Sequence, residues 1–533
     1  MKKIKYSTIG LVAALAMLSL NSCKKFLTTE LTAASQTDVS FYKTPSDAFT
    51  ALVGCYNGLD LIYNGEAIPP IMEVFSDNCF GATGASDGYG WEMMDEFNKT
   101  ISPSDVSMHS GGWKNYYQAI YRCNVLLQHM NQIAWGDSTT LKNQYTAETK
   151  FIRAYCYFDL ARLFEKVPLL TTPTLANVPQ SGPDSIYAQI MSDLRYAADS
   201  LPSATYTSVP NGRVTKWAAE SMLARVYLFY SGYYGKSTIG NESAATALAA
   251  VEDVIAHSGH GLVSDFTTLW PAASLAKKVT YAGEANKEVV FSIKYSSTGD
   301  YNGNITGNNW MVMTGMREQS LYPYGFGWGG CTVDPKLVAL FDPSKDSRYF
   351  ASITDIAKEN LAFGKAAANR EYTGYYMKKY SPICDSNNNP LPVSNYLVGQ
   401  SQDYFAIRYS DVLLMAAELG SPNAVSYFNQ VHQRAIPSAA AVTAVTKDDI
   451  LAERRLEFVG EGIRYWDLLR QGLATAASTI AANTTLSLIN DGTGTQPSAA
   501  TLQANITATR GFQQIPSDQI TLSSGVLKQN PGW

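Results

Sequence analysis

The strongest constraint on the fold is helical periodicity in two stretches rich in aromatic residues. The first, residues 112–126, carries large side chains at spacings of three and four: Trp113, Tyr116, Tyr117, Ile120 and Tyr121. This spacing places them on one face of an α-helix. Residues 146–164 show broad apolar faces, and Val167-Pro168 follows as a stop. The sequence therefore predicts two amphipathic helices that pack against each other.

Similar patterns extend the helical prediction over much of the chain. Further helices are predicted at residues 44–63, 185–201, 215–230, 243–257, 409–419, 423–434 and 447–470. Short connections favour antiparallel pairs, the packing unit of tetratricopeptide (TPR) arrays. No strict repeat is visible, since Tyr155 and Tyr227, at comparable points of two pairs, lie 72 residues apart. The predicted fold class is mostly α, with TPR-like helical pairs in an α-α superhelix, a loop-rich second subdomain and few short strands.

The N-terminus has the pattern of a bacterial export signal. Lys2, Lys3 and Lys5 precede an apolar run of twelve residues at 9–20, which is shorter than the roughly 20 residues that cross a bilayer but suits a signal peptide. Leu20-Asn21-Ser22-Cys23 then resembles a lipobox. We expect Cys23 to carry a lipid, the alternative being an ordinary signal peptide with a coincidental cysteine.

The helical pattern fades between about residues 259 and 402, where one short strand is predicted at 288–295. So long an irregular stretch exceeds an ordinary connection and indicates a separate subdomain. The predicted division is a lipoprotein signal peptide at 1–22, a lipidated tether at 23–40, an N-terminal helical region at 41–260, a loop-rich ligand-binding subdomain at 261–405 and a C-terminal helical region at 406–533. Residues 474–509 are weakly patterned and receive no assignment.

Charge and motif content narrow the function. A formal net charge of −5 with 16% charged residues provides no basic field for nucleic acid. Beyond Cys23, the cysteines lack CxxC or zinc-like spacing and are expected to be mostly buried thiols: Cys55, Cys79, Cys123, Cys156, Cys331 and Cys384. No nucleophile elbow, P-loop, HExxH or dinucleotide motif occurs. We predict no enzyme activity and no cofactor; calcium bound by loop Asp and Asn residues stays open, without an EF-hand register.

Carboxylates in the C-terminal helices offer a catalytic alternative: Asp411, Glu418, Glu453, Glu457 and Glu461. Spacings of four and seven put them on single helix faces, whereas glycosidase acids flank a bond from opposite sides. Arg454, Arg455, Arg464 and Arg470 lie in the same stretch. We therefore predict structural ion pairs. His257 and His260 are likewise predicted to be structural, because Gly259 interrupts the helix between them.

Two clusters of aromatic and polar residues on loops are candidate ligand-binding sites. A sugar ring presents an apolar face to an aromatic plane and hydroxyl groups to amides and carboxylates. The candidate residues are Asp77, Asn78, Tyr89 and Trp91 in the first cluster, near Asp87, and Asn309, Trp310, Tyr322, Tyr324 and Trp328 in the second, near Asn308 and Phe326. The alternative is that these side chains pack the loops onto the helices.

Several segments together resemble the SusD/RagB family of outer-membrane lipoproteins. The segments are residues 408–418, Phe428-Asn429, Arg434-Ala435, 453–458, 461–464 and 467–470, with Trp113, Tyr116-Tyr117, Asn124, Glu148, 151–154, Tyr157-Phe158 and Gly212-Arg213 in the first half. The C-terminal Gln529-Asn530-Pro531-Gly532-Trp533 is similar to the family's QNPGY ending. The resemblance spans nearly the whole chain except the loops.

The resemblance implies a surface glycan-binding lipoprotein that acts as the lid of a TonB-dependent, SusC-like transporter in the outer membrane of Bacteroidota. Its ligand would be an oligosaccharide or polysaccharide, bound by aromatic residues of the two loop clusters. Relatives often have acidic residues soon after the lipidated cysteine, whereas Lys24-Lys25 follow Cys23 here and the first acid is Glu30. The alternatives are a RagB-like peptide-binding protein, a glycoside hydrolase, or a lid that does not touch the cargo.

Overall fold

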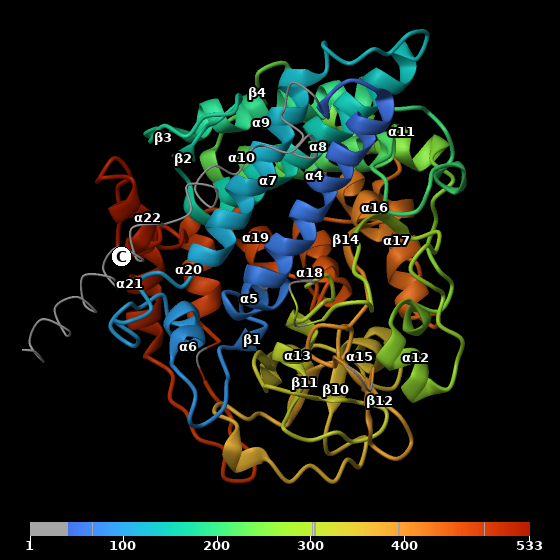
Figure 1. The fold of residues 1–533 in the computed structure, drawn as a ribbon. Helices are drawn as coiled ribbons and strands as arrows, with labels where there is room; N and C mark the ends of the chain where they lie inside the picture. Colours follow the sequence, from blue (N-terminus) through green and yellow to red (C-terminus); the bar gives the residue numbers. More distant parts are fainter. Residues whose placement is uncertain (1–40, 67, 301, 303–304, 393–394, 484) are drawn as a thin grey trace, which may run out of the picture.

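The computed structural model describes residues 41–66, 68–300, 302, 305–392, 395–483 and 485–533 (Figure 1). The predicted signal peptide, Cys23 and the tether at residues 23–40 lie outside the described residues. Within these ranges, none of the helices combines the length and the apolar character needed to cross a bilayer. The chain is mostly helical with short strands, which confirms the predicted fold class.

Long helices form the upper part of the molecule as drawn in Figure 1. They are α4 (Pro45–Glu66), α7 (Ser110–His129), α8 (Thr139–Phe164), α9 (Pro183–Ser200), α10 (Lys216–Tyr234) and α11 (Ala244–His257). Helices α8 to α11 pack in chain order, each on the next, and α4 packs on α7. This is the arrangement of helical pairs that the periodicity predicts, with α8 starting earlier than expected.

Local signals explain where these helices begin. Thr215 caps α10 by accepting a hydrogen bond from Ala218 N, and Ser243 does the same for Thr246 N at the start of α11. Pro183 occupies the first turn of α9, where its missing N–H is harmless. Side-chain caps and proline thus set boundaries that periodicity alone leaves loose.

Helices α4 and α7 run antiparallel at close range. Arg122 Nη1 donates a hydrogen bond to Gly54 O over 2.9 Å. Further along, a β-carbon at Gly58 would lie 2.6 Å from Ala119 Cβ. Residues later in α4 therefore meet residues earlier in α7, and the absence of a side chain at Gly58 permits the close contact.

The loop-rich region lies at the opposite end of the molecule in Figure 1. Its helices are short: α5 (Ile68–Val74), α6 (Gly90–Asp95), α12 (Pro271–Lys277), α13 (Trp310–Thr314), α14 (Pro335–Val338) and α15 (Ser347–Ser352), with 3-10 turns η2 (Phe266–Leu269) and η3 (Ala366–Ala368). Another 3-10 turn, η1 (Tyr206–Ser208), connects α9 to α10, and Tyr206 N donates to Ser258 O just after α11. Because α5 and α6 come from the first part of the chain, this end of the molecule is not built from residues 261–405 alone.

The strands form seven two-stranded sheets in the described residues. The pairs are β1 (Cys79–Phe80) with β9 (Thr332–Val333), β2 (Val167–Pro168) with β3 (Gln180–Ser181), β4 (Thr238–Ile239) with β5 (Glu242–Ser243), β6 (Val289–Ile293) with β14 (Tyr404–Arg408), β7 (Met316–Arg317) with β8 (Phe326–Gly327), β10 (Ile353–Asp355) with β11 (Tyr375–Met377), and β12 (Ile383–Cys384) with β13 (Pro390–Leu391). All are antiparallel except β7 with β8. Strand β6 confirms the prediction at residues 288–295, whereas β14 has no sequence signal because all five of its residues are buried.

The C-terminal helices are α16 (Tyr409–Glu418), α17 (Ala424–Ala435), α18 (Lys447–Glu457), α19 (Arg464–Leu469), α20 (Leu473–Ala481), α21 (Ala499–Thr509) and α22 (Ser517–Leu522). The single helix predicted at residues 447–470 is wrong, since α18 and α19 are separate. Gly460 and Gly462 have φ values of 80° and 72° between them, a left-handed conformation that a helix does not contain. Helices α20 and α21 fall within the stretch left unassigned.

One large hydrophobic core connects both helical regions, from Tyr42 to Leu527. Two smaller clusters lie in the loop-rich end, one around Cys331 and Tyr349 and another around Tyr324 and Tyr376. The six cysteines of the described residues are buried thiols without disulfide bonds, in line with the expectation for most of them. This core contains residues from all three of the predicted regions that the structure describes, 41–260, 261–405 and 406–533, and the division of the chain into regions stays a prediction.

Candidate functional site

Two segments that carry parts of the predicted aromatic clusters, residues 81–91 and 316–330, lie side by side and are called the first and second loop, although Trp91 already belongs to α6. Strand β1 ends just before the first loop and β9 begins just after the second. These strands pair antiparallel, with Cys79 opposite Val333 and Phe80 opposite Thr332. The chain therefore leaves β1 and enters β9 at the same end of this small sheet, so that two loops distant in sequence share one surface.

Arg317 joins these loops directly. Its Nη1 donates to Asp87 Oδ2 and to the carbonyl of Trp328, both over 3.0 Å. A third segment reinforces the junction, because Asn369 Nδ2 donates to Thr83 O over 2.9 Å and to Gly329 O over 3.0 Å. Hydrogen bonds from buried side chains to backbone carbonyls in both loops fix the relative position of the loops.

Arg370 supports the tip of the first loop. Its Nη1 donates to Asp87 O over 2.9 Å and its Nη2 donates to Gly88 O over 2.7 Å. The ring of Tyr89 lies over the same guanidinium, 4.0 Å from ring centroid to Cζ. Tyr89 is therefore held from below by a cation–π contact.

Three predicted aromatic residues are accessible at this junction. Tyr89 is 50% exposed and Trp328 is 46% exposed, while Trp91 is partly buried between the loops. A β-carbon at Gly330 would lie 2.9 Å from Trp91 Cζ3, so glycine permits the close packing of Trp91 on the second loop. We call Tyr89, Trp91 and Trp328 the aromatic platform.

Two further candidates occupy other positions. Tyr322 is exposed, and its backbone N–H donates to Asn388 Oδ1 over 2.8 Å. Asn309 is partly buried, and its backbone N–H donates to Asn64 Oδ1 over 3.1 Å. Within the described part of the chain, the contacts of Tyr322 and Asn309 do not include the aromatic platform, so neither residue is counted as part of it.

Asp77 and Asn78 require a correction, because both side chains are buried. Arg464 donates to both carboxylate oxygens of Asp77, over 2.8 and 3.0 Å. Burial would raise the pKa of Asp77, but Arg464 and Arg455 hold it below its ordinary value. Asn78 Nδ2 donates to Glu73 Oε2 over 2.8 Å. These polar residues connect α5 to the C-terminal helices and present no ligand-facing group.

Trp310 and Tyr324 also lie in the interior rather than on the loop surface. Trp310 Nε1 donates to Tyr295 Oη over 3.3 Å, and the Tyr324 hydroxyl donates to Glu359 Oε2 over 2.5 Å. Their polar atoms are satisfied within the protein, as buried aromatic residues require. Sequence placed these residues on loops, but it did not show that their side chains point inward.

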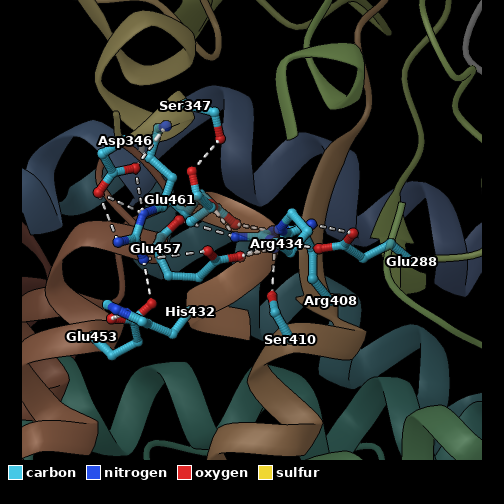
Figure 2. Close-up of polar contacts among 12 residues, drawn as sticks. Glu288, Asp346, Ser347, Arg408, Ser410, His432, Arg434, Glu453, Glu457 and Glu461 are labelled. Carbon is cyan, nitrogen blue, oxygen red and sulfur yellow. Dashed lines mark hydrogen bonds and ion pairs between the residues drawn. The ribbon is translucent and has the colours of Figure 1, made fainter. Parts of the chain in front are cut away.

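The carboxylates considered for catalysis form a buried ion-pair network centred on Arg408 (Figure 2). Arg408 Nη1 donates to Glu288 Oε1 over 2.6 Å and to Glu457 Oε1 over 2.8 Å. Its Nε donates to Glu461 Oε2 over 2.8 Å. One guanidinium thus joins the residue just before strand β6 to the end of α18 and to the turn that follows, which confirms the predicted structural role.

The network continues through other cations. Arg434 Nη2 donates to Glu457 Oε1 over 2.6 Å, and Arg348 Nη1 donates to Glu453 Oε1 over 2.6 Å. Burial opposes the charged form of Glu457, but Arg434, Arg408 and Arg348 lower its pKa to about 2. A carboxylate so strongly stabilised as an anion is a poor proton donor, which does not suit a general acid.

Asp411 and Glu418, the other carboxylates weighed for catalysis, are paired in the same way. Asp411 accepts hydrogen bonds from Arg225 and Arg454, both over 2.5 Å, and Glu418 pairs with Arg470. Glu288 and Arg225 lie in the predicted strand at 288–295 and the predicted helix at 215–230, and Arg348 lies in the irregular region. Sequence reasoning did not indicate any of the three as an ion-pair partner.

The histidines hold structural positions, as expected. His257 Nδ1 lies 2.6 Å from Asp253 Oδ1, and the His260 ring stacks on Tyr206 at 4.5 Å between centroids. Among the residues that the structure describes, no group of three or more His, Cys, Asp or Glu is arranged to hold a metal ion.

Two family models match the chain. The model described as the SusD family matches residues 287–533, and the model described as starch-binding associating with outer membrane matches residues 74–228. Together these matches include the C-terminal helices, the second loop and most of the first helical region. The fold is that of SusD-like helical proteins.

The chain belongs to the SusD/RagB family, which confirms the resemblance seen in its motifs. SusD-like protein P38 from Formosa agariphila is 26% identical over 513 residues, covering 89% of this chain and 93% of that protein. A SusD-like protein from Bacteroides ovatus is 24% identical over 487 residues, covering 86% and 81%.

Solved structures show the same fold. A laminarin binding SusD-like protein has a TM-score of 0.71 at 26% identity, covering 92% of this chain and 100% of that chain. Surface glycan-binding protein A from Bacteroides thetaiotaomicron, in complex with laminarihexaose, has a TM-score of 0.72 at 22% identity with the same coverage.

Proposed function

We propose that this protein is a lipid-anchored glycan-binding protein of the cell surface, which captures oligosaccharide as the lid of a SusC-like, TonB-dependent transporter. The observation that carries glycan binding is the aromatic platform. Arg317 brings two loops together so that Tyr89 and Trp328 are both accessible beside the carboxylate of Asp87. Aromatic planes stack on the apolar faces of sugar rings, and carboxylates accept hydrogen bonds from sugar hydroxyls.

Similar proteins support this proposal. One structural relative is named for laminarin binding, and another is described in complex with laminarihexaose. The description of one matching family model names both starch and the outer membrane. The predicted lipid on Cys23 supplies the anchor, and exposed Phe49 and Val53 on α4 leave apolar surface for a protein partner on the helical side.

We propose a binding role rather than catalysis. The carboxylates of the C-terminal motifs are occupied by arginine and lysine partners inside the protein, and Glu457 and Asp411 both have lowered pKa values. Burial keeps these carboxylates away from a glycosidic bond, and as anions they cannot serve as the general acid. A glycosidase reading would require a different pair of carboxylates.

Calorimetric titration of the protein with a polysaccharide panel and with a peptide mixture tests the cargo. We expect heat from at least one glycan and its loss in a Tyr89→Ala, Trp328→Ala double variant. Heat of binding from the peptide mixture, with none from any glycan, would show that the ligand is a peptide and not a glycan. Undiminished glycan binding in the double variant would move the site elsewhere.

Affinity purification from intact cells tests the partner and the location. We expect a TonB-dependent transporter to copurify, and external protease to cleave the protein on intact cells. A protein that resists external protease and does not copurify with a transporter would contradict the proposed role as a lid. A Cys23→Ala variant found in the soluble fraction would support lipid anchoring.

A further inference from the structure

The accessible charges on the two loops that carry the aromatic platform are negative. The side chains of Asp87 and Glu318 are 41% and 49% exposed, whereas those of Arg317 and Arg370 are 11% and 6% exposed. A ligand that lies on Tyr89 and Trp328 therefore meets carboxylates at the rim, while the guanidinium groups are beneath it.

The hydrogen-bonding capacity of Arg370 is committed to the protein. Its Nε donates to Glu92 Oε1 over 2.6 Å, and its Nη atoms donate to Thr83 Oγ1 and to the carbonyls of the first loop. Tyr89 covers one face of the guanidinium. Arg370 has no accessible fork with which to bind a sulfate or a carboxylate of a ligand.

Arg317 is committed in the same way. Its Nη1 bonds Asp87 and the carbonyl of Trp328, and its Nη2 lies 2.8 Å from Glu318 Oε1. Its Nε is buried. To turn toward an anionic ligand, Arg317 would have to release the contacts that hold the two loops together.

The neighbouring sequence does not supply replacement cations. Residues 81–92 include Asp87 and Glu92 but no lysine or arginine, and residues 315–330 contain Arg317 as their one basic residue. Lys365 is partly exposed, but its Nζ lies 3.9 Å from Glu318 Oε2, so its charge is opposed by a carboxylate. Recognition of polyanionic glycans depends on cations that are free to pair with them.

We infer that the aromatic platform selects uncharged glycans and rejects sulfated glycans and those rich in uronic acid. The inference rests on the proposed function, because it assigns a chemical class to the same site. Its basis is the placement of Asp87 and Glu318 at the surface, with Arg317 and Arg370 held beneath the loops. A neutral sugar ring can stack on the aromatic side chains, whereas the carboxylates of Asp87 and Glu318 repel a sugar that carries a negative charge.

Matched pairs of polymers test the inference. Laminarin, soluble starch and dextran are each titrated in parallel with their carboxymethylated and sulfated derivatives. For any polymer that binds, we expect the Kd of the anionic derivative to be at least tenfold higher than that of the neutral parent at low ionic strength. This difference in Kd should become smaller as the salt concentration rises. Equal or tighter binding of the anionic derivative would overturn the inference while leaving glycan binding intact. If none of the polymers binds, the result would instead contradict the proposed function and, with it, this inference.

A charge reversal at the rim locates the effect. Glu318→Lys should reduce the ratio of the Kd for the anionic polymer to the Kd for the neutral polymer by roughly fivefold, since the charge near the ligand changes by two units. Glu318→Gln should reduce this ratio less. The matched control is Asp199→Lys, which makes the same change of net charge on an exposed residue of α9, in the helical part of the molecule. An equal effect of both lysine variants would show that net charge, not the rim, sets selectivity and would overturn the assignment.

Discussion

Arg317 Nη1 donates to Asp87 Oδ2 over 3.0 Å across 230 residues of sequence, and the same nitrogen bonds the carbonyl of Trp328. This contact joins the two aromatic loops directly, beside the hydrogen bonds of Asn369 and the pairing of β1 with β9. The residue is a positioning residue, because its guanidinium lies beneath the loops.

Arg317→Ala should weaken glycan binding about tenfold, an order-of-magnitude estimate for losing pre-organised contacts between loops. Acrylamide quenching of tryptophan fluorescence should rise, because the loop that carries Trp328 becomes mobile. Arg317→Lys should restore binding in part, through a single contact to Asp87. The matched control is Arg195→Ala, which breaks a two-point pair with Glu242 on the helical side; a similar loss there would contradict a local role.

Trp328→Ala should weaken glycan binding by about 1–2 kcal/mol, or roughly five- to thirtyfold, the size of a good aromatic contact. Tyr89→Ala should have a smaller effect. Tyr121→Ala is the control, since Tyr121 is a similarly exposed aromatic residue on α7. Circular dichroism should be unchanged in all three, and equal affinities would refute the aromatic platform.

Arg408→Ala should lower the free energy of unfolding by about 3–5 kcal/mol, because Glu288, Glu457 and Glu461 would remain buried without this cation. Chemical denaturation measures the change. Lys277→Ala, which breaks an exposed pair with Asp265, should change stability by less than about 1 kcal/mol. Comparable losses in both variants would show that burial of the network contributes nothing.

Stability should fall in acid. Glu457, Glu453 and Asp467 have folded-state pKa values below their ordinary ones because arginine partners, and His432 at Glu453, outweigh the effect of burial. At these three carboxylates the unfolded chain therefore binds more protons than the folded one below about pH 4–5. Their contribution is present above that range and is lost as pH falls toward the folded value of about 2 for Glu457. Buried carboxylates with raised pKa values, such as Glu73 at about 6 and Asp60 at about 7, act with the opposite sign, but mainly above pH 5. Urea unfolding at pH 5, 4 and 3 should show the decline, and a flat profile over this range would refute it.

Gly462→Ala should destabilise the protein more than Gly420→Ala. Both glycines have positive φ values, 72° and 86°, so each substitution costs about 1 kcal/mol in backbone strain. A β-carbon at Gly462 would also lie 2.7 Å from Pro69 Cα, whereas one at Gly420 meets nothing within 4 Å. Thermal unfolding should therefore show the larger decrease in Tm for Gly462→Ala, and equal decreases would contradict the close contact with α5.

The sequence by itself determined the helical regions and the family. Periodicity is a local property, so residues 112–126 and 146–164 indicate most of α7 and α8 without knowledge of the rest of the chain. The helix starts predicted at residues 215 and 243 likewise coincide with the caps at Thr215 and Ser243. It did not hold for β14, whose buried residues do not alternate and whose partner β6 lies more than a hundred residues earlier.

The sequence predicted that the charged residues of the C-terminal motifs form ion pairs, but it did not predict all of their partners. Arginine and carboxylate residues close together on helices indicated ion pairs, yet Glu288, Arg348 and Lys379 reach the network from other segments. Such pairs depend on packing between distant elements, and sequence spacing does not record it.

Only the tertiary structure decided which aromatic residues are available to a ligand. Trp310 and Trp328 both follow loop residues rich in glycine or asparagine, so local sequence treats them alike. Trp310 turns inward to Tyr295, whereas Trp328 lies on the edge of a loop that Arg317 and β9 hold at the surface. The direction of each side chain follows from the path of the backbone, and the path of the second loop depends on the pairing of β9 with β1, more than two hundred residues earlier in the sequence.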